Sequence, residues 1–136
     1  MVIVYCKEQG DIKVKRALGW LRRNNIEYKI KEVNEDNFTY ETFLHFLKMT
    51  VTGMDEILSK KGDGRRAEII DGEHSDKSLS GIYDVIIDDP EYLDLPLLID
   101  ERGRTATLGT RRENKEYENL TVFRQTKPVD KSMLND

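Results

Sequence analysis

Cysteine and histidine are scarce in this chain, and their scarcity excludes several kinds of site. The 136 residues contain one cysteine, Cys6, and two histidines, His45 and His74, which stand 29 positions apart. A single thiol excludes an internal disulfide and a thiolate-rich metal cluster, and it fits a reducing compartment. The histidines would ligate a metal only with carboxylates brought in by the fold, so we expect no metal site. Glycine-rich phosphate loops and nucleophile elbows are also missing, so we expect no cofactor.

Long apolar runs and an excess of basic residues are missing as well. Charged residues begin at Lys7 and Glu8, after only a short apolar opening, so no stretch has the length of a signal peptide or a membrane span. We expect a cytoplasmic protein without membrane contact. Lys and Arg number 22 against 26 Asp and Glu, which gives a net charge of −4 and a pI near 5.3. This balance argues against a surface that grips a phosphate backbone throughout.

Hydrophobic periodicity predicts a strand, a helix and a second strand in the first 33 residues. Residues 2–5 form a short apolar, β-branched run, which is typical of a buried strand. Over residues 11–24 the apolar side chains recur at i, i+3, i+4 and i+7, which predicts a helix. Ile26, Tyr28 and Ile30 then alternate with charged residues and predict a strand with one face toward water. The order indicates a βαβ unit.

The middle of the chain predicts short helices joined by loops. Helical spacing returns over 40–47 and again over 54–58, and Gly53 separates these two segments. The polar segment 59–75 carries three glycines and predicts a loop or at most a partly helical connection. A further helical stripe over 78–88 predicts another helix.

The last third predicts a β-hairpin, a short helix and a tail. Residues 97–99 and 105–108 are expected to be strands that flank a turn at 100–104. Residues 111–119 form a charged segment that predicts a short helix. Residues 121–136 show no period, so we expect a C-terminal tail that is a candidate for disorder.

The predicted order is β-α-β, a helical insertion, then α-β-β-α, which is the order of a thioredoxin-like α/β fold with a mixed sheet and a helical lobe. We expect one domain over residues 1–120, with the insertion at about 36–90. Such folds place a proline just before the third strand, commonly after a cis peptide bond, and Leu95-Pro96 occupies that position. We therefore expect a cis bond there and a structural role for Pro96.

Three segments resemble a known family. The segment LKMTVTGMDEILSKK, residues 47–61, is very similar to the corresponding stretch of the Spx-type transcriptional regulators, which belong to the arsenate reductase-like branch of thioredoxin-like proteins. The opening VIVYC with KRALGWLRRNNIEY, and the later PLLIDERG, are similar to the first strand, first helix and third strand of the same family. The resemblance extends over most of residues 1–120.

The resemblance implies a regulator that binds the C-terminal domain of the RNA polymerase α subunit, redirects transcription, and meets DNA only indirectly through polymerase. Gly53 matches the family glycine at that contact, where a bare Cα lets a partner approach closely. A glycine at a helix end can also be required for a positive φ, and the two interpretations are compatible. Lys48 and Lys61 flank Gly53 as candidate charged contacts, although, taken alone, each is better explained as a solvated surface charge. We expect Gly53→Arg to abolish docking and to leave the fold intact.

The sequence departs from the family where redox chemistry is expected. Family members usually carry a Cys-x-x-Cys switch, and the reductases a catalytic cysteine, in the loop that enters the first helix. Here those positions are Gly10 and Lys13, or Asp11 and Val14 if one residue is inserted. Arsenate reductases also have an arginine directly before the proline that precedes the third strand, where this chain has Leu95. We therefore expect neither family-type arsenate reductase activity nor an intramolecular disulfide switch.

Cys6 leaves an alternative open. A lone cysteine at the end of a buried strand is typically a small hydrophobe. An exposed thiolate of low pKa, favoured by Lys7 and a helix N-terminus, would instead be a redox residue. Without a second cysteine it would act through glutathionylation, an intermolecular disulfide or a sulfenate. The alternatives are thus an arsenate reductase-like or glutathione-dependent oxidoreductase using Cys6, and an adaptor that keeps the fold and binds another protein.

Overall fold

A mixed four-stranded sheet forms the centre of the protein. The computed structural model describes residues 1–59, 65–70, 72, 74, 76–108 and 117–124. The strand order is β2-β1-β3-β4, in which β1 runs parallel to β2 and antiparallel to β3, and β3 runs antiparallel to β4. The strands are β1 (Val2–Cys6), β2 (Tyr28–Glu32), β3 (Leu97–Asp100) and β4 (Thr105–Thr107). This arrangement confirms the predicted mixed sheet, and Leu95-Pro96 is cis as expected.

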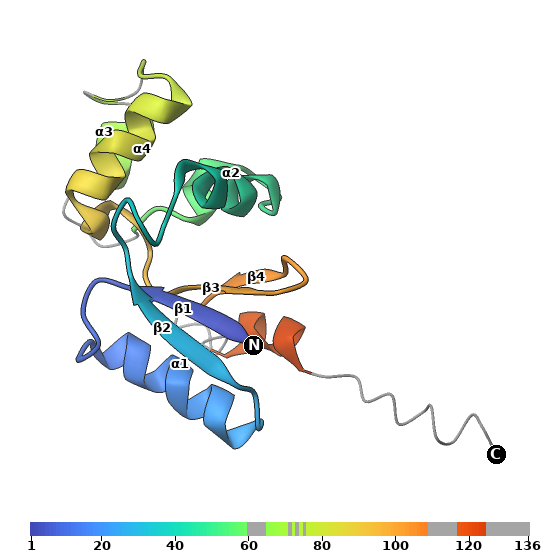
Figure 1. The fold of residues 1–136 in the computed structure, drawn as a ribbon. Helices are drawn as coiled ribbons and strands as arrows, with labels where there is room; N and C mark the ends of the chain where they lie inside the picture. Colours follow the sequence, from blue (N-terminus) through green and yellow to red (C-terminus); the bar gives the residue numbers. More distant parts are fainter. Residues whose placement is uncertain (60–64, 71, 73, 75, 109–116, 125–136) are drawn as a thin grey trace.

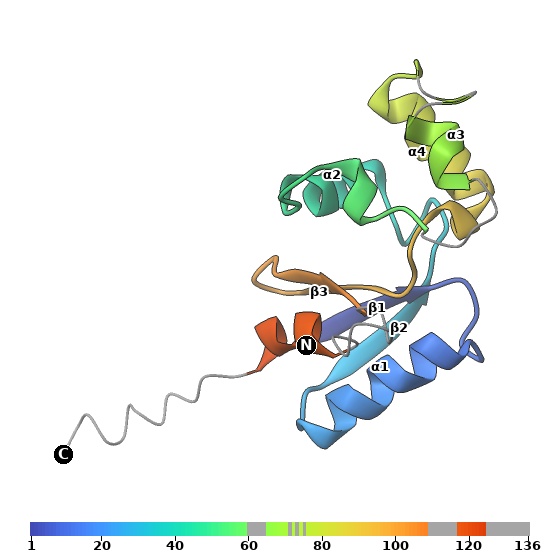
Figure 2. The ribbon, with the colours of Figure 1, turned by 180° about the vertical axis from the view of Figure 1, so that it is seen from behind.

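Helices cover both faces of the sheet (Figure 1). Helix α1 (Ile12–Arg23) lies on one face, and α2 (Tyr40–Lys48), α3 (Arg65–Ile70) and α4 (Leu79–Asp88) form a lobe over the other, as the view from behind also shows (Figure 2). Short 3-10 helices complete the described elements: η1 (Met54–Glu56), η2 (Pro90–Tyr92) and η4 (Glu118–Phe123). The helical lobe between the two halves of the sheet is therefore confirmed.

Helix α1 forms where the sequence pattern predicts it. The Asp11 side chain caps its N-terminus by accepting a 2.7 Å hydrogen bond from the Lys13 backbone N–H, and two arginines in the last turn complement the helix dipole. Asn25, with a φ of 55°, ends the helix. The buried residues are those of the predicted apolar stripe together with the tryptophan beside it: Val14, Ala17, Leu18, Trp20 and Leu21.

Alternation along β1 separates two hydrophobic cores. Val4 and Cys6 point toward α1, into a core that also holds Phe123 of η4. Tyr5 points the other way, into the lobe core, where its ring packs edge-on against Phe38 at 5.2 Å between centroids. The lobe is thus attached to the sheet by a continuous apolar contact.

The 59–75 connection is partly helical, which the prediction allowed. Its helix α3 forms because Ile69 is 4% exposed and its burial in the lobe core stabilises a helix too short to persist alone. Two other segments differ from their predicted form. The predicted helix at 54–58 is the single 3-10 turn η1. Of the predicted helix at 111–119, residues 111–116 lie outside the described residues, and η4 runs past its expected end. Phe123, assigned to the tail, is 2% exposed in the α1 core, whereas residues 125–136 lie outside the described part.

Candidate functional site

The loop that joins α2 to η1 is held by its own side chains. The Thr50 hydroxyl donates to the Leu47 carbonyl at 2.7 Å and accepts from the Gly53 N–H at 3.1 Å. One carboxylate oxygen of Glu56 accepts from the Val51 N–H at 2.9 Å and from the Thr52 hydroxyl at 2.7 Å. We call residues 48–56 the docking loop, after the contact that the sequence resemblance implies, and these bonds fix its shape.

Gly53 adopts a backbone conformation that favours glycine strongly. Its φ of 103° and ψ of −158° lie in a region that is essentially restricted to glycine. A Cβ built on it would meet nothing within 4 Å, so the space beside the Cα is open. A positive φ was one of the two interpretations of Gly53 in the sequence, and the structure confirms it. The expectation that Gly53→Arg leaves the fold undisturbed needs correction, because any L side chain at this φ strains the backbone.

The docking loop exposes two apolar side chains close to Gly53 in the sequence. Val51 is 92% exposed and Met49 is 47% exposed, which is unusual for side chains of this kind. Both line a groove of about 600 Å³ whose far wall comes from β4 and η4 and includes the half-exposed Val122. Lys48 is exposed at the end of α2, and Lys61 lies outside the described residues. The groove thus brings together three apolar residues that the sequence analysis missed, while Gly53 and Lys48 belong to the docking loop but are not among the residues that line the groove.

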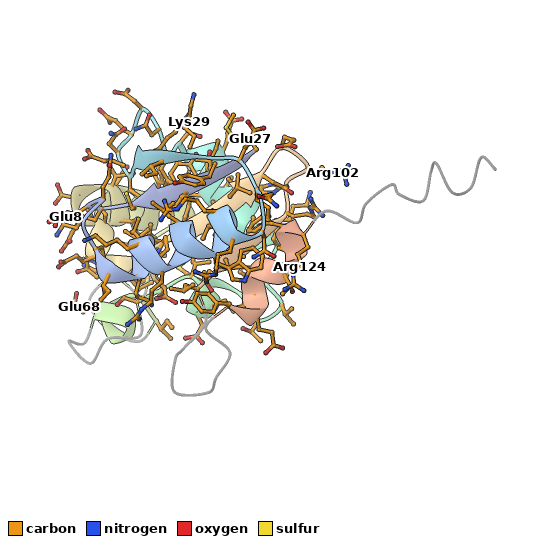
Figure 3. The ribbon with its side chains drawn as sticks, turned by 90° about the horizontal axis from the view of Figure 1, so that it is seen from below. Glu8, Glu27, Lys29, Glu68, Arg102 and Arg124 are labelled. Carbon is orange, nitrogen blue, oxygen red and sulfur yellow. The ribbon has the colours of Figure 1, made fainter. Side chains whose placement is uncertain are left out.

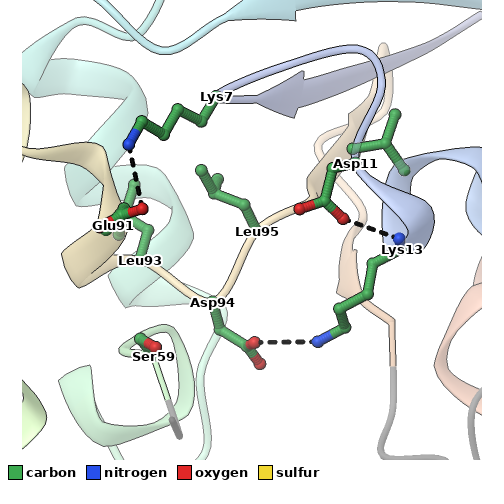
Figure 4. Close-up of a pocket in the computed structure, with 9 residues that line it drawn as sticks. Lys7, Asp11, Lys13, Ser59, Glu91, Leu93, Asp94 and Leu95 are labelled. Atoms are coloured by element: carbon green, nitrogen blue, oxygen red, sulfur yellow. Dashed lines mark hydrogen bonds and ion pairs between the residues drawn. The ribbon is translucent and has the colours of Figure 1, made fainter. Parts of the chain in front are cut away.

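A second pocket lies between the start of α1 and the segment before Pro96, in the region where the sequence resemblance implies a redox cysteine (Figure 4). It has a volume of about 240 Å³, and two ion pairs lie among the residues that line it. The Lys13 ammonium lies 3.3 Å from Asp94, and the Lys7 ammonium lies 3.0 Å from Glu91, which raises the pKa of Lys7.

Three of the four positions to which the resemblance assigns the family thiols line this pocket. These are Asp11, Lys13 and Val14, whereas Gly10 is not among the lining residues. Leu95, which the resemblance matches to the arginine of the reductases, stands between the two ion pairs (Figure 4). None of the described lining residues is a cysteine. The described lining of this pocket therefore supplies no thiol nucleophile.

The sequence of this chain is similar to those of known transcriptional regulators. The chain is 28% identical to the global transcriptional regulator Spx of Staphylococcus saprophyticus over 88 residues, which are 65% of this chain and 66% of the relative, just under two thirds of its length. It is 26% identical to the Spx of Lactiplantibacillus plantarum over 102 residues, 75% of each chain. No protein-family model matches.

Solved structures extend the likeness to the fold. A possible arsenate reductase from Streptococcus mutans superposes with a TM-score of 0.64 at 19% identity, over 88% of this chain and 97% of that one. An arsenate reductase (ArsC) related protein from Brucella melitensis superposes with a TM-score of 0.56 at 20% identity, over 86% and 93%. This chain is an Spx/ArsC-like protein of thioredoxin fold.

In this Spx/ArsC-like chain, Cys6 does not have the environment of a reactive thiolate. Its side chain is fully buried at the end of β1. Burial raises the pKa of the Cys6 thiol, and the negative charges of Glu32 and Asp11 raise it further. A raised pKa and a buried sulfur are the opposite of what thiolate chemistry needs, so the geometry opposes the oxidoreductase that uses Cys6.

Charged side chains lie on all sides of the Spx/ArsC-like chain. Of those labelled in Figure 3, Glu8 and Glu68 lie toward one end of the molecule and Arg102 and Arg124 toward the other, with Glu27 between them and nearer the arginines. Within the described ranges, no group of three or more metal-ligating side chains comes together. No helix in the same ranges has the length and hydropathy to cross a bilayer.

Proposed function

We propose that this chain is a transcriptional regulator that docks on the C-terminal domain of the RNA polymerase α subunit through the docking loop. The observation that carries the proposal is Gly53, whose bare Cα faces open space in a hydrogen-bonded loop next to exposed apolar side chains. Two relatives named as global transcriptional regulators support the class of function. The partner places the protein in the cytoplasm and brings DNA to it only through polymerase.

The loop has the physical properties of a preorganised contact. Because Thr50 and Glu56 already fix its backbone, binding does not have to order it, and that saving raises affinity. Burying a valine side chain fully is worth about 1.5–3 kcal/mol, and Val51 is almost fully available for burial. Gly53 lets a partner backbone approach, while Lys48 at the loop entrance supplies a charge at the rim. Lys61 is the second candidate rim charge.

The proposed docking is independent of thiol oxidation. The chain has one cysteine, and that cysteine is buried away from the docking loop. The ion pairs of Lys7 and Lys13 lie at the pocket that would otherwise hold a switch. We therefore infer a regulator whose contact with polymerase is the same under oxidising and reducing conditions.

A charge placed on the exposed valine tests the contact without touching the core. We expect Val51→Asp to weaken calorimetric binding to the isolated α C-terminal domain at least tenfold, since the carboxylate would be buried without a partner. Ile12→Asp is the matched control, because Ile12 is 62% exposed at the first residue of α1. It should bind like the parent. Failure of the parent to bind, or equal binding by both variants, would overturn the proposal.

A further inference from the structure

A third hollow lies on the face of the sheet that looks toward α2. Its volume is about 490 Å³, and it shares no lining residue with the groove beside the docking loop. Thr42 of α2 contributes to its wall, and β1, β2 and β3 all contribute to its floor and rim. The proposed docking function makes no use of this hollow.

The floor of the hollow is apolar and rigid. In the sheet register, Ile3 of β1 lies between Ile99 of β3 and Lys29 of β2, and both isoleucines are only partly buried. Tyr5 borders them, and its ring is held against Phe38 and its hydroxyl donates to a backbone carbonyl at 3.0 Å. A strand floor with a fixed aromatic wall is a preformed surface for an alkyl chain.

The rim of the hollow carries two lysines. Alternation along β2 puts Lys29 and Lys31 on the same face of the sheet, and neither side chain makes a hydrogen bond or an ion pair with another described residue. Figure 3 shows Lys29 projecting at the edge of the molecule.

The acidic residues across the hollow are already neutralised. Asp100 accepts from the Arg104 guanidinium at 2.7 Å, and Glu101 pairs with the Met1 amino group. Among the described residues that line the hollow, the charges without an ionic partner are therefore the two ammonium groups beside the apolar floor.

We propose that this hollow binds a small anionic amphiphile, a single alkyl chain that carries a carboxylate. The alkyl chain lies over Ile3 and Ile99, and the carboxylate lies between the ammonium groups of Lys29 and Lys31. The volume is that of a small-molecule site, and α2 closes one side, so a short chain fits better than an extended peptide. Lysines on an edge strand also discourage pairing with other strands, and that purely protective role is the alternative outcome of the test.

Decanoate and decanol are the probes, because they share an alkyl chain and differ in charge. Binding is measured by the chemical-shift changes of the backbone amides of β1 and β3 in a titration. We expect decanoate to bind about tenfold more tightly than decanol, because its carboxylate makes charge-assisted hydrogen bonds to two lysines. In Lys29→Gln with Lys31→Gln this preference should disappear while decanol binding persists. Lys15→Gln with Lys77→Gln, which removes two exposed lysines elsewhere, should keep the preference.

Three results would overturn the proposal. Decanoate that does not bind, or binds without preference over decanol, would leave Lys29 and Lys31 with only the protective role. A preference that survives the double substitution would place the carboxylate elsewhere. Shifts confined to residues outside the hollow would exclude the site. The variants change exposed or half-exposed side chains, and their far-UV circular dichroism confirms that both fold before the titrations are compared.

Discussion

Gly53→Ala should destabilise the protein even though the added methyl group meets nothing. The φ of 103° and ψ of −158° hold Gly53 in a region where a side chain costs about 1–3 kcal/mol. An alanine also restricts the unfolded chain, which returns about 0.4–1 kcal/mol. At the middle of both ranges, the net loss in the free energy of unfolding is about 1.3 kcal/mol. Because no atom lies within 4 Å of the new Cβ, this loss comes from the backbone alone.

Gly10→Ala provides the matched control. A Cβ at Gly10 also meets nothing within 4 Å, but its φ lies outside the left-handed region. The same methyl group is added to an open site in both variants, and only the backbone conformation differs. We expect Gly10→Ala to be neutral or to stabilise the protein by up to about 1 kcal/mol.

Urea unfolding measures the difference. Trp20 is the only tryptophan and is buried in the α1 core, so its fluorescence follows that core, while far-UV circular dichroism follows the lobe helices as well. Coincident transitions are needed before a two-state free energy is calculated. If Gly53→Ala is as stable as Gly10→Ala, the docking loop is not held in its glycine-only conformation, and the argument that it is preorganised fails.

Three further predictions test other parts of the structure. The folded-state pKa of Cys6 is raised, so the stability that its protonated thiol contributes is complete below the unfolded pKa of about 8.5 and is lost as the pH rises through the folded value. The urea midpoint should therefore fall more steeply above pH 8.5 in the parent than in Cys6→Ala. Parallel curves would contradict this. Gly103→Ala should lower the free energy of unfolding more than Gly53→Ala does, since Gly103 has a φ of 81° and its Cβ would lie 3.1 Å from the His45 ring. In a double-mutant cycle, His45→Ala should restore the part of this loss that comes from the steric contact. Additive losses would refute the prediction. Asp100→Ala should lower the free energy of unfolding by about 2–3 kcal/mol, because the Asp100 carboxylate accepts hydrogen bonds from two backbone N–H groups of the hairpin turn and from an arginine. Glu101→Ala, at the surface, should change it little. Equal urea midpoints for the two variants would show that the turn bonds are dispensable.

The strands, the longer helices and their order could be predicted from the sequence because their burial is periodic. The stripe of α1 and the alternation of β2 each depend on residues near one another in the chain. Helix α3 was harder, because its segment is polar and rich in glycine and its burial depends on Ile69 meeting distant parts of the lobe. The extent of η4 likewise depends on Phe123 reaching the α1 core.

The candidate site could be predicted only in part. A motif match pointed to Gly53, but its φ and the open space beside it are properties of the folded loop. Val51 follows a helix end without continuing any apolar stripe, so its exposure left no periodic signal. The Lys13–Asp94 pair joins residues 81 positions apart, and nothing in local spacing indicates it. Sequence patterns therefore locate a loop, while its shape depends on contacts from far along the chain.

Titration of the isolated polymerase α C-terminal domain with the parent, Gly53→Ala and Gly53→Arg tests the central claim most directly. Both variants carry the same backbone strain, so their difference reports only the bulk and charge placed at the contact. The account predicts that the parent binds, that Gly53→Ala retains measurable binding, and that Gly53→Arg does not bind. Equal binding by the two variants, or no binding by the parent, would contradict it.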